Sequence, residues 1–209
     1  IGSYSGGVDM AIPMEHTLEF VRHEYLNSQS LINNGVNDVM QSVDAQGHNS
    51  KIWYATDKGV SIYDEQTQQW HHALYNKVVL TLCQTADGKV LAGTYGDGIF
   101  QVHADGSSSR AYSVSNGKLK TDYVYSIFKD SEGVLWIGCL DGDLVHIPSS
   151  LEKNGNVDNS VNYLPINEVQ SIVESPDKKI IAVGTTHGSY RIDKRSLRVS
   201  RFFYPSEFP

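Results

Sequence analysis

Residues 130–144 read DSEGVLWIGCLDGDL, and this stretch decides the fold. An apolar run, Val134–Ile137, stands between two turns that contain Asp and Gly. Short runs of β-branched and aromatic residues between such turns are typical of β-hairpins, because Gly tolerates a positive φ and Asp hydrogen-bonds its own backbone. The stretch therefore predicts two short strands joined by a tight turn.

The same arrangement recurs along the chain, with a small residue at one fixed position. These anchor residues are Gly2, Ala55, Gly93, Gly138 and Gly184, at a mean spacing of about 45 residues. A period of this length is typical of β-propeller blades, and it is too long for leucine-rich or ankyrin repeats. The repeat therefore predicts a β-propeller.

Each of the four complete copies predicts four short antiparallel strands, as in a propeller blade. The expected first strands are Val36–Asp44, Val78–Thr85, Asp122–Lys129 and Val169–Glu174. The expected third strands are Val60–Asp64, Ile99–His103, Leu144–Ile147 and Tyr190–Asp193. On the second strand, a small anchor residue would let the next blade approach closely. The positions two residues earlier are expected in the core between blades, and they hold Trp53, Leu91, Trp136 and Ala182.

We therefore expect an all-β fold: a partial β-propeller of about four and a half four-stranded antiparallel blades, with residues 1–209 forming one domain. The complete blades are expected at 31–75, 76–114, 119–165 and 166–205, after an incomplete blade at 1–25. A propeller closes on itself to hide its edge strands. Four and a half blades do not close a ring, so the sequence is expected to be a slice of a longer propeller.

Composition excludes some function classes for this segment. Its 17 basic and 24 acidic residues give a formal net charge of −7, which disfavours a nucleic-acid footprint. No apolar run is long enough to cross a membrane as a helix. Because the sequence starts at Ile1 without a leader, any signal peptide is expected to be removed or to lie outside it. Cys83 and Cys139 sit in apolar runs and are expected to be buried free thiols.

The motif D-x-x-G-x-x-W-x-G of residues 130–138, followed by Gly142 and Leu144, resembles the two-component regulator propeller repeat. The next best copy is Lys89–Ile99. Two copies depart from the pattern, since Cys139 stands for the Thr of the motif and Ala55 for its Gly. The resemblance covers nearly the whole chain.

Such repeats occur in the extracytoplasmic sensor region of hybrid two-component sensors of gut Bacteroidetes. In that family two propellers and an immunoglobulin-like module precede a membrane helix, a histidine kinase core and response-regulator parts. The resemblance implies a periplasmic location, with further blades and signalling domains in the same chain. These 209 residues contain no kinase His box or receiver aspartate cluster. We therefore expect no enzyme activity in this segment, although the full-length protein would be a histidine kinase.

The turns after the second strands and the connections between blades are expected on one face around the central channel, the usual ligand site of this fold. Acidic, imidazole and exposed tyrosine side chains in these turns suit a sugar, because they hydrogen-bond hydroxyls and stack on the pyranose ring. We therefore predict an oligosaccharide ligand. The predicted binding residues are Tyr4, Asp57, Tyr95, Asp97, Asp141 and His187.

Other candidate residues favour structural roles. His71 and His72 are adjacent on a strand and so point to opposite faces, which argues against a metal pair. Asp141 and Asp143 could share a face as a carboxylate pair, although a solvated turn is the simpler interpretation. The polar insertion Ser149–Ser160 is expected as a loop on the opposite face. No catalytic residue, metal or cofactor is predicted.

Three functional hypotheses remain open at this point. The first is a non-catalytic, glycan-responsive part of a periplasmic sensor. The second is a protein-interaction propeller of a secreted or surface protein. The third is a propeller lyase or hydrolase that uses His187 and the acidic turns. The expected partners are the remaining blades and signalling domains of the same chain and a second copy as a homodimer, with no nucleic acid.

Overall fold

The computed structural model describes residues 2–3, 7–11, 18–148 and 161–203, and the described residues form strands without a helix. They make one three-stranded and four four-stranded sheets, and every pairing is antiparallel. The three-stranded sheet contains β1 (Gly2–Ser3), β2 (Gly7–Ala11) and β3 (Leu18–Val21). This three-stranded sheet is the incomplete blade. The blades numbered first to fourth below are the four-stranded sheets.

Each four-stranded sheet is one blade, with its strands in chain order. The first blade contains β4 (Val36–Val43), β5 (Asn49–Thr56), β6 (Gly59–Asp64) and β7 (Gln69–Ala73). The second contains β8 (Val79–Gln84), β9 (Val90–Thr94), β10 (Ile99–Val102) and β11 (Ser108–Tyr112). The third contains β12 (Val124–Lys129), β13 (Leu135–Cys139), β14 (Leu144–Ile147) and β15 (Asn162–Leu164). The fourth contains β16 (Val169–Glu174), β17 (Ile180–Thr185), β18 (Gly188–Asp193) and β19 (Val199–Phe203).

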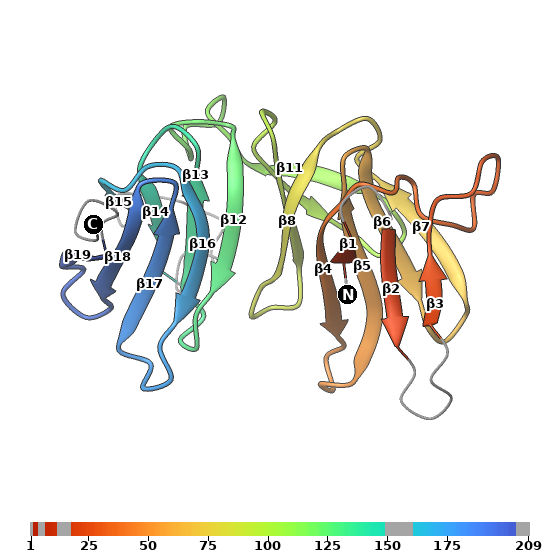
Figure 1. The fold of residues 1–209 in the computed structure, drawn as a ribbon, viewed down its shortest axis with the longest axis horizontal. Coiled ribbons are helices and arrows are strands. Elements are labelled where there is room, and N and C mark those ends of the chain that lie inside the picture. Colours follow the sequence, from red (N-terminus) through yellow and green to blue (C-terminus); the bar gives the residue numbers. More distant parts are fainter. Residues whose placement is uncertain (1, 4–6, 12–17, 149–160, 204–209) are drawn as a thin grey trace, which may run out of the picture.

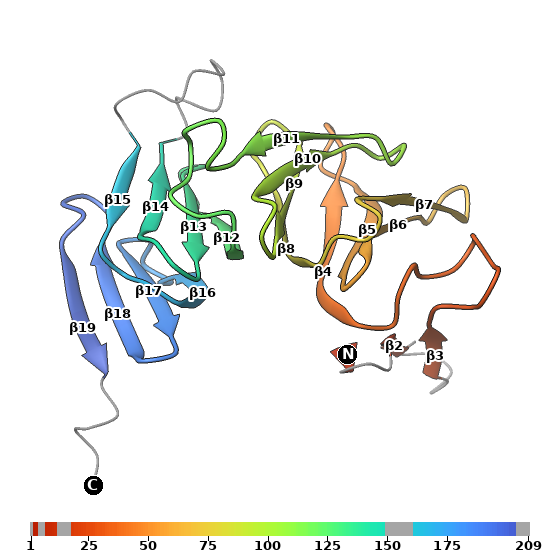
Figure 2. The same ribbon diagram turned by 90° about the horizontal axis from the view of Figure 1, so that it is seen from above.

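The sheets follow one another in chain order around an arc, as Figure 2 shows from above, with the β1–β3 sheet at one end and the β16–β19 sheet at the other. Figure 1 shows the strands of neighbouring blades standing face to face. The predicted partial propeller is confirmed. Two predicted strand starts differ by two residues: β12 begins at Val124 rather than Asp122, and β18 begins at Gly188, which pairs with Thr185, rather than at Tyr190. Among the described residues no helix is long and apolar enough to cross a membrane.

The first strand of each blade contains the same β-bulge. The register shifts between Val36 and Asp38, and at the corresponding places in β8, β12 and β16. A bulge leaves one residue unpaired and increases the local twist. These extra residues are Asn37, Leu80, Tyr125 and Gln170. In each of the four strands, the side chain of the extra residue therefore does not follow the alternation of side chains between the two faces of the sheet.

Apolar side chains from facing blades form the core. Trp53 and Ile62 of the first blade pack with Val79 and Phe100 of the second, and equivalent clusters join the second blade to the third and the third to the fourth. Trp53, Leu91 and Trp136 are all buried, which confirms their predicted position between blades. Ala182 is exposed instead, because no described residues cover that face of the fourth blade.

The anchor glycines act as predicted. A Cβ on Gly93 would lie 2.8 Å from Val124 Cγ1, and one on Gly138 would lie 2.5 Å from Val169 Cγ1. Both valines begin the first strand of the following blade. The absence of a side chain at the anchor therefore sets how closely two blades pack.

The threonine after the anchor closes the turn between the second and third strands. Thr94 Oγ1 donates to the carbonyl of Gly98 at 2.7 Å and accepts the amide of Asp97 at 3.1 Å. Thr56 and Thr185 make the same bond to Gly59 and Gly188. In three of the four blades a threonine hydroxyl therefore satisfies the turn, whereas the third blade has Cys139 at this position.

We expect Thr94→Val to destabilise the protein by about 1–2 kcal/mol, because the isosteric methyl leaves a buried carbonyl and an amide with one partner fewer. Urea denaturation measures the free energy of unfolding. Thr94→Ser is the matched control, and it should cost less because it keeps the hydroxyl that makes both hydrogen bonds. Equal destabilisation by both substitutions would contradict the proposed role of the hydroxyl.

Candidate functional site

Backbone hydrogen bonds join the turns after the second strands to the connections that enter the blades. Asp57 N donates to Gly35 O at 3.0 Å, Tyr95 N to Val78 O at 2.9 Å, and Leu140 N to Tyr123 O at 3.1 Å. The turns and the connections therefore lie on one edge of the blades. We call this edge the turn face.

Three tyrosines gather on the turn face where the second and third blades meet. The ring centroids of Tyr95 and Tyr123 are 4.9 Å apart, and those of Tyr95 and Tyr125 are 6.3 Å apart, both edge to face. Tyr95 is 48% exposed and Tyr123 is 38% exposed, while Tyr125 is half-buried. A β-bridge between Tyr95 and Tyr123 fixes their backbones. We call these residues the tyrosine cluster.

Acidic groups from two blades lie close enough to act on the cluster. Burial, followed by the nearby Tyr95 phenol and the negative charges of Asp141 and Glu168, raises the pKa of Tyr125 above its usual value. Glu168 enters the fourth blade, and its Oε2 lies 3.1 Å from Nδ1 of His187. The structure therefore brings three predicted residues, Tyr95, Asp141 and His187, into one neighbourhood around Tyr125 and Glu168.

The other predicted binding residues lie elsewhere. Asp97 Oδ1 pairs with Lys77 Nζ at 2.9 Å and Arg110 Nη2 at 3.6 Å, and both cations lie over the Phe100 ring. Asp97 therefore serves an ion pair beside the tyrosine cluster. Asp57 accepts a hydrogen bond from Asn37 Nδ2 at 3.0 Å, in the first blade.

Tyr4 and the insertion Ser149–Ser160 lie outside the described residues, so no position is given for either. Asp143 forms an ion pair with Lys120, and Asp141 is exposed. His71 is exposed, whereas His72 bonds Ser61 at 3.1 Å, so the two imidazoles point to opposite faces as predicted.

Cys83 and Cys139 are buried cysteines without a disulfide bond, as predicted. Burial raises the pKa of Cys139 to about 12, so this thiol stays protonated near neutral pH. Within the described ranges, no group of three or more His, Cys, Asp or Glu side chains is arranged to hold a metal ion.

Sequence reasoning missed Tyr125 and Glu168 as site residues. Tyr125 is the extra residue of the β12 bulge, and a strict alternation through the strand does not show where that bulge lies. Glu168 precedes β16 and has a positive φ of 55°, which few non-glycine residues adopt. An alignment of the first strands of the four blades on their bulges would have placed Tyr125 at the position that Asn37 has in the first blade. It would thus have marked Tyr125 as the extra residue of its strand.

Residues 118–141, which contain Tyr123, Tyr125 and the Trp136 motif, match the protein family described as two component regulator propeller. The chain contains a two component regulator propeller repeat. This finding confirms the resemblance seen in the sequence. No curated protein matches the chain.

Solved structures share the fold of this chain at low identity. The extracellular domain of a proposed hybrid two component system from B. thetaiotaomicron, BT4673, has 19% identity and a TM-score of 0.73, covering 97% of this chain and 29% of that chain. The corresponding domain of BT3049 has 21% identity and a TM-score of 0.70, with 97% and 26% covered. PorZ, a surface component of the type-IX secretion system of Porphyromonas gingivalis, has 13% identity and a TM-score of 0.67, with 100% and 32% covered. The chain thus spans less than a third of the length of these structures.

Proposed function

We propose that this chain is part of the periplasmic ligand-sensing region of a hybrid two-component sensor, and that it responds to a glycan without catalysing a reaction. The regulator propeller repeat at residues 118–141 and the likeness to extracellular domains of such systems support a sensor. The tyrosine cluster on the turn face is the single observation that carries the choice of ligand.

The chemistry of the cluster suits a sugar. The exposed rings of Tyr95 and Tyr123 offer apolar faces for stacking on a pyranose, and the phenol of Tyr125 adds a hydrogen-bonding group. The carboxylates of Asp141 and Glu168 accept hydrogen bonds from hydroxyl groups. Because both carboxylates repel anions, we expect neutral oligosaccharides to bind better than sulfated or uronic acid-containing ones.

The same groups connect ligand binding to the packing of blades. Tyr95 belongs to the second blade, Tyr123 and Tyr125 to the third, and Glu168 leads into the fourth. A ligand that contacts all three blades stabilises the arrangement of blades in which those contacts are best. A ligand shifts a conformational equilibrium only by its difference in affinity for the two states, so this bridging position is what a sensor requires.

Isothermal titration calorimetry of the complete natural polypeptide with a panel of neutral and anionic oligosaccharides tests the proposal. Tyr95→Ala and Tyr125→Ala should each weaken binding of the best ligand by about tenfold or more, since removing a buried aromatic contact costs above about 1 kcal/mol. Tyr25→Ala, an exposed tyrosine outside the cluster, should leave the affinity unchanged.

Three outcomes would contradict the proposal. They are the absence of any glycan ligand, an affinity that is insensitive to Tyr95 and Tyr125, and turnover of the bound sugar. Turnover would favour the lyase or hydrolase alternative. A protein partner that binds with no sugar would favour the interaction propeller.

A further inference from the structure

A polar hollow lies between the first and second blades, at the edge opposite the turn face. The hairpins that join first to second strands and third to fourth strands meet at this edge, because each blade is an antiparallel meander. Its volume is about 330 Å³, and small-molecule sites have volumes of about 300–1,000 Å³. The lining side chains that matter below are Ser42, Lys51, Lys89, Gln101, His103 and Ala104.

The interface between the third and fourth blades is filled at the corresponding place. Ser42 corresponds to Asp130, because each lies two residues after the first-strand partner of its tryptophan. The indole of Trp53 donates to Ser42 Oγ at 3.0 Å, and that of Trp136 donates to Asp130 Oδ2 at 3.1 Å. Beside Asp130 lies the ammonium of Lys194, at 3.0 Å. A buried lysine therefore occupies this position in the later interface.

The interface between the first and second blades has an alanine in place of that lysine. Ala104 corresponds to Lys194, because both lie two residues beyond the third-strand partner of the residue three before the anchor. Gln84 corresponds to Glu174, since each side chain accepts a backbone amide of the previous blade. The hollow is thus the space that a lysine fills elsewhere, and neutral groups replace the carboxylates that hold its charge.

Two lysine ammonium groups border the hollow. Lys51 Nζ lies 2.8 Å from Asp64 Oδ2, and Lys89 Nζ lies 2.6 Å from Asp87 Oδ2. An ammonium has three donors, and each of these ion pairs uses one of them. Asp87 is also held by its own hairpin, because Thr85 Oγ1 donates to Asp87 Oδ1 at 2.5 Å. Both lysines therefore keep donors for a ligand.

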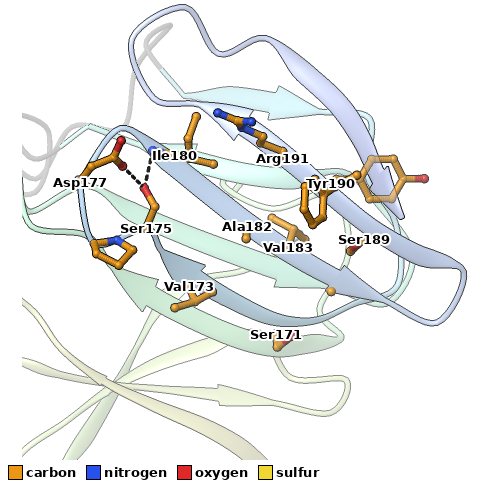
Figure 3. Close-up of a pocket in the computed structure, with 13 residues that line it drawn as sticks. Ser171, Val173, Ser175, Asp177, Ile180, Ala182, Val183, Ser189, Tyr190 and Arg191 are labelled. Atoms are coloured by element: carbon orange, nitrogen blue, oxygen red, sulfur yellow. Dashed lines mark hydrogen bonds between the residues drawn. The ribbon is translucent and has the colours of Figure 1, made fainter. Parts of the chain in front are cut away.

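The fourth blade holds the counterpart of Asp87 in the same way. There Ser175 Oγ donates to Asp177 Oδ1 at 2.6 Å and accepts the amide of Ile180 at 3.0 Å, as Figure 3 shows. The bond from a hydroxyl to this aspartate is therefore a repeated feature of the hairpin. Asp87 serves the hairpin, whereas Lys89 beside it has no such repeated role.

We propose that the hollow binds a small hydroxylated carboxylic acid. Its carboxylate accepts charge-assisted hydrogen bonds from Lys51 and Lys89, which are stronger than bonds between neutral groups. Its hydroxyl groups bond Gln101 and His103, whose side chains lie 3.3 Å apart at the rim. The carboxylates of the turn face repel an anion, so the two edges have opposite preferences. This inference does not rest on the proposed function.

Isothermal titration calorimetry of the complete natural polypeptide with D-galacturonate tests the proposal. D-galactose is the matched neutral probe, because it differs only in a hydroxymethyl group in place of the carboxylate, and it should bind at least about tenfold more weakly. Lys89→Met should weaken binding of galacturonate by about tenfold or more, since it removes a hydrogen bond to a charged group. Lys58→Met removes an exposed lysine of the first blade at the turn face, and it should leave the affinity unchanged.

A second variant closes the hollow without changing its charge. Ala104→Met introduces an uncharged chain about as long as that of Lys194, and it should abolish binding of galacturonate. Tyr125→Ala should leave that binding unchanged, because the tyrosine cluster lies at the opposite edge.

The proposal would be overturned if galacturonate did not bind, if galactose bound as tightly, or if Lys89→Met and Ala104→Met had no effect. A loss of affinity from Lys58→Met or Tyr125→Ala as large as that from Lys89→Met would also overturn it, because galacturonate would then bind at the turn face. That last result would leave the proposed sensing role of the turn face standing, so the two proposals fail separately.

Discussion

Lys194→Met is expected to destabilise the protein by about 3–5 kcal/mol, because it leaves two largely buried carboxylates without their cation. The Lys194 side chain is only 6% exposed, and its Nζ lies 3.0 Å from Asp130 Oδ2 and 2.5 Å from Glu174 Oε1. Asp130 belongs to the third blade, whereas Glu174 and Lys194 belong to the fourth. The ion pair therefore holds two blades together.

The surrounding hydrogen bonds increase the dependence on this cation. Asp130 Oδ2 also accepts Trp136 Nε1 at 3.1 Å, and Glu174 accepts the amide and hydroxyl of Ser131. Burial by itself lowers the pKa of Lys194, but the hydrogen bonds and charges of Glu174 and Asp130 outweigh it and raise that pKa above the usual range. Lys194 therefore carries its positive charge at neutral pH.

Chemical denaturation at pH 7 measures the effect, with Lys120→Met as the control. Lys120 pairs with Asp143 on the surface, where removal of an exposed pair costs about 0–1 kcal/mol. A loss from Lys194→Met no larger than that from Lys120→Met would show that the buried ion pair does not hold the blades together.

The ion pairs of Lys194 with Asp130 and Glu174 also predict that the free energy of unfolding depends on pH. Burial tends to raise the pKa of Asp130 and Glu174, yet the bonds from Trp136 and Ser131 and the ion pair with Lys194 leave both pKa values lowered. A lowered pKa contributes stability above the unfolded value of about 4, and that stability is lost as the pH falls through the folded value. The difference in unfolding free energy between the native protein and Lys194→Met should therefore shrink as the pH falls below about 4.

Gly138→Ala is expected to destabilise the protein by about 2–3 kcal/mol through overpacking. The added Cβ would lie 2.5 Å from Val169 Cγ1 and 2.8 Å from Val169 Cβ, so the third and fourth blades would have to separate. Thermal and urea unfolding both measure the loss.

Gly184→Ala is the matched control on the open face of the fourth blade. There the nearest atom to an added Cβ is Ser171 Oγ at 2.6 Å, which can rotate away, and the next is Ser171 Cβ at 4.0 Å. We expect a change within about 1 kcal/mol of zero, since loss of glycine entropy in the unfolded chain offsets small strain. Equal costs for the two substitutions would contradict the role of the anchor glycine in blade packing.

The sequence predicts most of the fold because each structural requirement recurs. Gly93 and Gly138 both have to admit a valine of the next blade, and Trp53 and Trp136 both fill the space beside it. A requirement that recurs in every blade produces a periodic pattern in the sequence. That pattern can be recognised without knowing which residues are in contact.

The candidate site is less predictable because its contacts do not repeat. Tyr125 faces the site only because of the β12 bulge, and its acidic neighbours come from other turns. Asp97 was predicted as a binding residue, but its cations, Lys77 and Arg110, come from a connection and an outer strand. Lys194 and Asp130 meet across two blades, and no local pattern in either segment indicates that pairing.

Under the proposed function the complete polypeptide would autophosphorylate, and a ligand dose–response of that activity is the most direct test of a sensing role for the turn face. Tyr125→Ala should raise the half-maximal ligand concentration by about tenfold or more, with the maximal output unchanged, because it weakens ligand contacts and leaves the signalling parts intact. Tyr25→Ala should match the native curve. A Tyr125→Ala curve that coincides with the native one would contradict the proposal that this face senses the ligand.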